Sequence, residues 1–165
     1  AHNGEDAAKT WAEGVHANLA RKPEGNDRAQ VKAIWAGECD ISLGNTYYMG
    51  KMLADPEQVP WADSVRIVFP TFENGGTHVN VSGIAMTKSA PNKAEATELM
   101  EYLVSPEAQG LYAELNTEYP VLDGAPVAEL VASWGAFTPD DMDLGTLAAN
   151  RPIALRIMEE VNFDG

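Results

Sequence analysis

The 165-residue sequence contains a single cysteine, Cys39, and little positive charge. One cysteine excludes an internal disulfide and any cysteine-based metal cluster. The 11 Lys and Arg residues against 25 Asp and Glu residues give a formal net charge of −14. This charge disfavours nucleic acid and anionic membranes as partners, because both require a basic surface. No apolar run approaches the ~20 residues of a membrane-spanning helix, so we expect no membrane insertion.

The sequence also lacks a signal peptide and an initiator methionine. We therefore expect a cytoplasmic chain, a mature chain, or a piece of a longer one. A mass of 17.8 kDa with 45% hydrophobic and 22% charged residues predicts one ordinary domain or two small lobes.

Recognisable catalytic patterns are missing as well. The three histidines, His2, His16 and His78, lie far apart, and no glycine-rich phosphate loop or nucleophile elbow occurs. Carboxylates are abundant but scattered, so no acid–base pair stands out. We interpret the protein as a non-enzyme.

Helical and extended patterns occur in the first half of the chain, and mostly helical patterns follow. Apolar spacing and capping residues predict helices over residues 5–20, 26–35 and 46–54, then from 91, from 106 and from 126, and over 150–161. Apolar runs predict strands at 39–43 and 65–70, a loop at 56–61, and a long extended segment at 78–86. The helix–strand–helix order predicts an α/β unit with a parallel sheet.

Two adjacent tyrosines, Tyr47 and Tyr48, stand where the predicted strand 39–43 passes into a helix. Free phenols titrate near pKa ~10, so a phenolate at neutral pH needs a nearby positive charge. A ferric ion supplies that charge, and its hardness suits anionic oxygen ligands. The pair is therefore a candidate ferric site. Two tyrosines at the start of a helix are also typical of half-buried packing residues.

Six stretches carry a resemblance to a known family: 25–31, 36–40, 45–48, 76–83, 102–109 and 116–121. In this order the chain resembles the C-terminal half of bacterial periplasmic ferric-iron-binding proteins, the transferrin-like solute receptors of iron ABC transporters. The Ser-Pro-Glu-Ala-Gln motif is shared with receptors for other ligands. The Asn-x-Tyr-Tyr motif is the part of the resemblance that indicates ferric iron as the ligand.

The resemblance implies a set of site residues. Tyr47 and Tyr48 would supply two phenolate ligands to Fe(III). Asn45 would lie near the iron or its companion, a carbonate or other synergistic anion, and Lys51 would support the charge balance. The remaining ligands would come from the N-terminal half of the receptor.

The resemblance also implies a fold, an α/β periplasmic-binding-protein type II-like lobe that is incomplete because family members have two lobes and a longer chain. Residues 1–78 would form a C-terminal-lobe segment carrying the tyrosine pair. Residues 79–128 would provide a hinge strand and helices that return to the N-terminal lobe, and 129–165 would be C-terminal helices. Asp27 and Arg28 would lie in a segment that approaches the cleft.

The implied location is the bacterial periplasm, and the implied partners are an ABC permease and the N-terminal half of the same receptor. Apolar faces and sheet edges left without that half would favour a homodimer of this chain. Two alternatives stay open. One is a receptor for a small anion with the tyrosines as hydrogen-bond donors. The other is a self-associating interaction module without a ligand.

Overall fold

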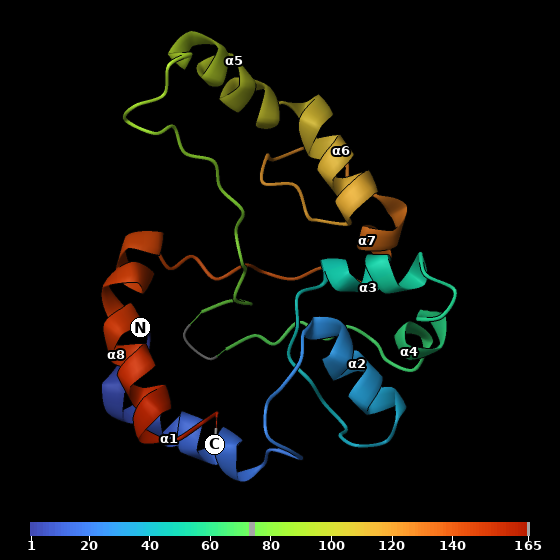
Figure 1. Ribbon diagram of the computed structural model, residues 1–165, viewed down its shortest axis with the longest axis vertical. Coiled ribbons are helices and arrows are strands. Elements are labelled where there is room, and N and C mark those ends of the chain that lie inside the picture. The colour runs from blue at the N-terminus through green and yellow to red at the C-terminus, as the bar shows by residue number, and fades with distance from the viewer. Residues whose placement is uncertain (73–74, 165) are drawn as a thin grey trace. The chain divides into compact units, whose positions relative to one another are not determined.

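The computed structural model describes residues 1–72 and 75–164, which form helices joined by irregular segments (Figure 1). The helices are α1 Gly4–Ala17, α2 Asp27–Trp35, α3 Tyr47–Leu53, α4 Val59–Asp63, α5 Lys93–Leu103, α6 Pro106–Asn116, α7 Glu129–Ser133 and α8 Leu144–Glu160. None of the helices in the described ranges has the length and apolar character needed to cross a membrane.

The chain forms two compact units, and each is built from separate stretches of sequence. Unit 1 comprises Ala1–Ile41, Val68–Val79 and Phe137–Gly165, and unit 2 comprises Ser42–Ile67 and Asn80–Ala136. Helices α1, α2 and α8 therefore belong to unit 1, and helices α3 to α7 belong to unit 2.

Unit 1 is organised by the packing of α1 against α8. Ala12 of α1 and Ile157 of α8 are buried. An ion pair joins the same two helices, with Lys9 Nζ 2.6 Å from Glu160 Oε2. Because exposed ion pairs contribute little net free energy, we attribute the stability of this helix pair chiefly to its apolar contact.

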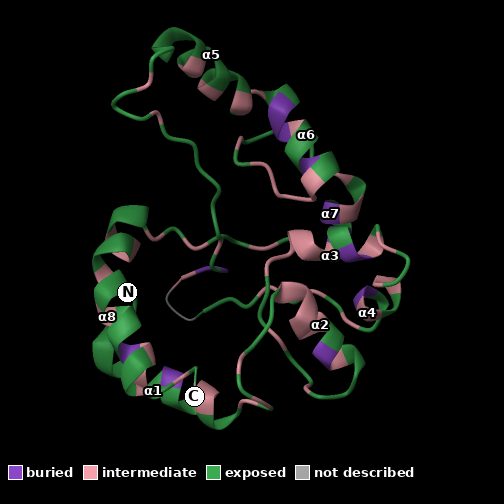
Figure 2. Cartoon of the chain, in the orientation of Figure 1, coloured by how far each residue is buried: buried purple, intermediate pink, exposed green. Residues whose placement is uncertain are grey.

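The buried side chains of unit 2 lie on α3, α4, α6 and α7. The largest fully buried side chains are Met52 of α3 and Val131 of α7. Three alanines are buried as well: Ala62, Ala108 and Ala113. In Figure 2 these residues give short purple bands on otherwise pink and green helices, so the core is narrow. Small side chains at these positions allow the helices to approach one another closely.

The predicted helices over 5–20, 26–35 and 46–54 are confirmed, with small shifts at their ends. Two of the predicted helices begin at side-chain caps. Asn26 Oδ1 accepts a hydrogen bond from the Ala29 amide at 3.1 Å, at the start of α2. Ser105 caps α6 in the same way. Pro106 follows at the first helical position, where a proline is tolerated because a backbone N–H there would have no partner within the helix.

Three boundaries differ from the prediction. The loop predicted at 56–61 ends at Gln58, because a turn held by Asp55 leads into α4 at Val59. The helix expected from 126 begins at Glu129. The last helix was predicted over 150–161 but begins at Leu144, because Asp143 caps it by accepting a hydrogen bond from the Thr146 amide at 2.8 Å.

The predicted strands are wrong as strands of this chain. Residues 39–43 and 65–70 are neither helix nor strand, and the segment predicted to be extended, 78–86, forms no strand either. The described ranges contain no ladder, only a single parallel bridge between Thr77 and Pro139. A strand needs a neighbour to pair with its backbone.

Apolar side chains in these extended runs are exposed. Ile41 is 83% exposed and Val68 is 71% exposed. Exposed apolar residues on unpaired extended backbone are typical of surfaces that pair with another chain segment.

The cap at Asn26 provides a stability prediction with a matched control. Asn26→Ala removes a formed capping bond, so we expect the free energy of unfolding to fall by about 1 kcal/mol. Asn92 stands at the N-cap of α5 but makes no side-chain capping bond. Asn92→Ala should therefore change stability by less than about 0.5 kcal/mol. Urea unfolding measures both, and equal losses would contradict the prediction.

Candidate metal centre

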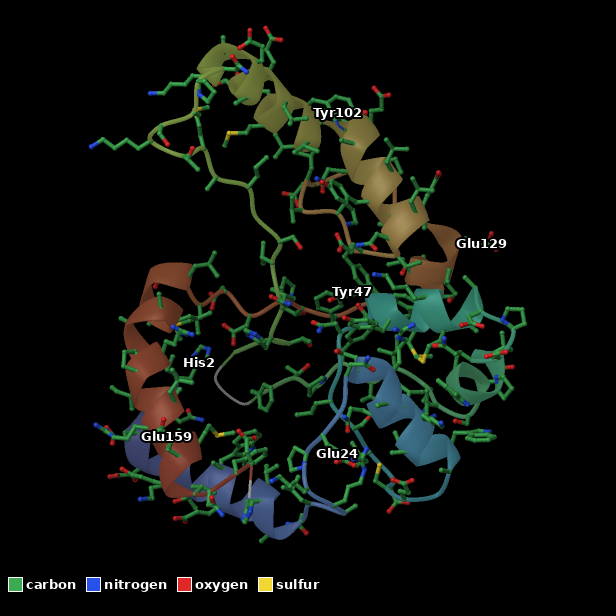
Figure 3. All side chains as sticks on the ribbon, viewed as in Figure 1. His2, Glu24, Tyr47, Tyr102, Glu129 and Glu159 are labelled. Atoms are coloured by element: carbon green, nitrogen blue, oxygen red, sulfur yellow. The ribbon has the colours of Figure 1, made fainter. Side chains whose placement is uncertain are left out.

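The first turn of α3 carries the tyrosine pair, Tyr47 and Tyr48. Figure 3 labels Tyr47. The Tyr48 amide donates to the Asn45 carbonyl at 3.3 Å, and the Met49 amide donates to the Thr46 carbonyl at 3.0 Å. Both bonds span three residues, which is the pattern of a tight 3₁₀-type turn. This turn sets the directions in which Tyr47 and Tyr48 leave the backbone.

The two tyrosine rings lie side by side. The ring centroids of Tyr47 and Tyr48 are 4.5 Å apart, and the ring planes meet at 34°. Neighbouring residues of a helix ordinarily point about 100° apart and do not face each other. Both side chains are half-buried. The local backbone thus brings two phenol rings together at one end of α3.

A positive charge lies over both rings. Lys51 Nζ is 5.1 Å from the centroid of the Tyr47 ring and 5.5 Å from that of Tyr48. Residues three and four positions apart are neighbours on a helix surface, which explains how one lysine reaches both rings. A cation within about 6 Å of a ring centroid interacts favourably with the ring, and it also attracts a negative oxygen nearby.

A second amide stands beside Asn45. Asn80 Nδ2 donates to Asn45 Oδ1 at 3.3 Å. Asn80 is not among the predicted site residues, although it lies in the stretch 76–83 that carries the resemblance. No local pattern marks this amide, because it meets Asn45 only in the folded chain.

The structure brings Tyr47, Tyr48 and Lys51 together within unit 2. Asp27 and Arg28 lie in the first turn of α2, in unit 1, and both are half-buried. Their participation in a site stays a prediction.

In the described ranges 1–72 and 75–164, no group of three or more His, Cys, Asp or Glu residues could hold a metal ion. Phenol oxygens suit a hard, highly charged cation, so the donor chemistry of the tyrosine pair fits ferric iron. The first turn of α3 is therefore the candidate metal centre.

Residues 3–110 match the family described as "Bacterial extracellular solute-binding protein". The chain belongs to this family. Its similarity to iron uptake protein A1 of Synechocystis is 45% identity over 163 residues, covering 98% of this chain and 45% of that protein.

Solved structures are also similar to this chain. The ferric iron-binding protein A of Mannheimia haemolytica, in an open conformation, is 51% identical with a TM-score of 0.95, over 99% of this chain and 52% of that one. A Trichodesmium protein solved with iron and citrate ligands is 42% identical with a TM-score of 0.91, over 98% of this chain and 52% of that one.

These comparisons confirm the resemblance to ferric-iron-binding proteins and the fold class, part of a periplasmic-binding-protein type II fold. The relatives are named for uptake and binding, which agrees with the interpretation as a non-enzyme. The chain spans about half the length of these relatives.

Proposed function

We propose that this chain is part of a ferric-ion receptor of the bacterial periplasm and that Tyr47 and Tyr48 bind the iron as phenolates. The observation that carries the proposal is the pair of half-buried rings beneath the Lys51 ammonium group. The similarity to proteins named for iron uptake and ferric binding supports it. A receptor binds its ligand without changing it, so no catalytic residue is assigned.

Two phenolates are only part of the coordination that iron prefers, which approaches about six donors in octahedral geometry. We propose that the remaining donors come from the N-terminal half of the receptor and from an anion such as carbonate or citrate. A Trichodesmium relative was solved with iron and citrate. Asn45, with Asn80 bonded to it, would lie beside that anion, and Lys51 would offset the negative charge of the ligands.

Release of iron follows from the same chemistry. Phenolate ligands must be deprotonated, so protons compete with the metal and acid favours release. Reduction of the bound iron to the less charged ferrous ion would weaken its bonds to the phenolates, which also favours release. We propose that the loaded receptor closes around iron and is recognised by an ABC permease.

As the resemblance implies, residues 1–78 and 129–165 would belong to the C-terminal lobe, and residues 79–128 would return to the N-terminal lobe. This division differs from that of the two compact units, in which residues 42–67 cluster with 80–136. The exposed apolar residues Ile41 and Val68 would then pair with the N-terminal half, or with a second copy of this chain in its absence.

The test is a visible absorption titration with ferric citrate. It compares the chain alone with the chain mixed with the N-terminal half of the Mannheimia protein. A broad tyrosinate-to-iron charge-transfer band in either sample supports the proposal. A band only in the mixture would show that the site needs the second half. Absence of a band in both samples would contradict ferric binding and favour the small-anion receptor.

A further inference from the structure

Thr117, the residue that follows α6, has a left-handed backbone with φ 55° and ψ 40°. Among the described residues other than glycine, Thr117 shares a positive φ only with Asn162. Asparagine tolerates this conformation, but a β-branched residue rarely adopts it. Such strain persists where the surroundings hold the residue in place, and it is found most often at functional sites.

The Thr117 side chain reaches the tyrosine pair. Its Oγ1 lies 3.1 Å from the Tyr47 carbonyl oxygen, across 70 positions of sequence. The same Oγ1 lies 2.7 Å from the Asn116 carbonyl oxygen. A threonine hydroxyl carries one proton, so the two carbonyls share this donor. The bond to Tyr47 is the one that ties the segment after α6 to the first turn of α3.

Gly50 makes this approach possible. It is buried in α3, one turn beyond Tyr47 on the same face of the helix. A Cβ built on Gly50 would overlap the side chain of Thr117. Glycine inside a helix is unfavourable relative to alanine, and the close contact with Thr117 explains its presence here.

The segment 116–121 that carries Thr117 is anchored on other parts of unit 2. The buried Gln109 side chain accepts a hydrogen bond from the Val121 amide at 2.8 Å. The Tyr119 hydroxyl donates to the Val131 carbonyl at 3.2 Å, and burial raises the pKa of this phenol. These hydrogen bonds hold the segment 116–121, which places Thr117 against α3.

We propose that Thr117 is a positioning residue for the tyrosine pair. Its side chain packs over Gly50 and its hydroxyl bonds the Tyr47 carbonyl, which fixes the rotation of the first turn of α3 and the direction of both phenols. This inference rests on the proposed ferric function and deepens it, because two phenolates from adjacent residues must converge on one ion.

The first arm of the test needs no metal. Two tyrosine rings that lie side by side give a near-ultraviolet circular dichroism signal. The contribution of this pair is the part of the wild-type signal that Tyr47→Phe/Tyr48→Phe loses. Thr117→Val keeps the shape and β-branching but removes the hydroxyl, and we expect it to lose this signal. Thr117→Ser keeps the hydroxyl and should retain it. Thr117→Gly removes the hydroxyl without backbone strain and replaces the valine variant if that variant does not fold.

The second arm measures ferric citrate binding in the sample that shows the charge-transfer band. Loss of one hydrogen bond predicts about three- to tenfold weaker binding for Thr117→Val. Thr117→Ser should stay within about twofold of wild type. Wild-type behaviour of the valine variant in the dichroism signal, or equal losses for valine and serine, would overturn the inference. If wild type binds no iron, the proposed function fails while the metal-free arm still decides the role of Thr117.

Discussion

Replacing Tyr47 and Tyr48 together with phenylalanine is expected to abolish the charge-transfer band and to weaken ferric binding by more than about 100-fold. Phenylalanine keeps the ring contact but removes both oxygen donors. Changes to residues that only support metal ligands already cost about 10- to 100-fold in affinity, so loss of two ligands should exceed that range. The measurement is the ferric citrate titration in the visible region, with the affinity obtained by competition against a chelator.

The matched control changes two other tyrosines of the same unit. Tyr102 at the end of α5 and Tyr112 on α6 are 42% and 38% exposed. Figure 3 marks Tyr102 there, and Tyr47 on a different helix, α3. Tyr102→Phe/Tyr112→Phe should leave the band and the affinity unchanged. Unaltered iron binding in the Tyr47/Tyr48 variant would refute the assignment of the ligands.

The second large effect is expected for a substitution in the core of unit 2. Met52 lies on α3 and its exposed fraction is 0%. Met52→Ala would leave a cavity in a narrow core that has few other large side chains to fill it. We expect the free energy of unfolding to fall by about 2–5 kcal/mol, as for other large-to-small changes in cores.

Urea unfolding of Met52→Ala and of a surface control measures this loss. Leu115 on α6 is 81% exposed, so Leu115→Ala removes a similar volume from solvent rather than from the core. We expect the control to change stability by less than about 0.5 kcal/mol. A loss at Met52 no larger than the loss at Leu115 would show that α3 is not packed as described.

The starts of α2 and α6 could be predicted because the capping residue and its partner are close in the chain. Asn26 caps the amide of Ala29, and Ser105 caps the amide of Ala108, each three residues ahead. The strands could not be predicted from the same kind of evidence. An apolar run such as 39–43 indicates extended backbone, but whether it joins a sheet depends on a neighbour elsewhere, and the described ranges supply none.

The candidate site shows the same division between local and distant information. Lys51 lies four positions after Tyr47 and three after Tyr48 on one helix, so sequence alone predicts that it neighbours both. The contact between the two rings depends on the tight turn that opens α3. Asn80 meets Asn45 across 35 positions. Thr117 meets Tyr47 across 70 positions. Contacts of this length depend on the path of the whole chain, which periodicity and capping patterns do not encode.

The interleaved order of the two units limits how this protein can be divided. The chain changes unit after Ile41, after Ile67, after Val79 and after Ala136. A single cut anywhere in the sequence therefore leaves at least one unit without one of its pieces. A gene truncated before residue 137 would encode α1 without its packing partner α8. Neither unit can be deleted from the gene or moved into another gene as one contiguous segment.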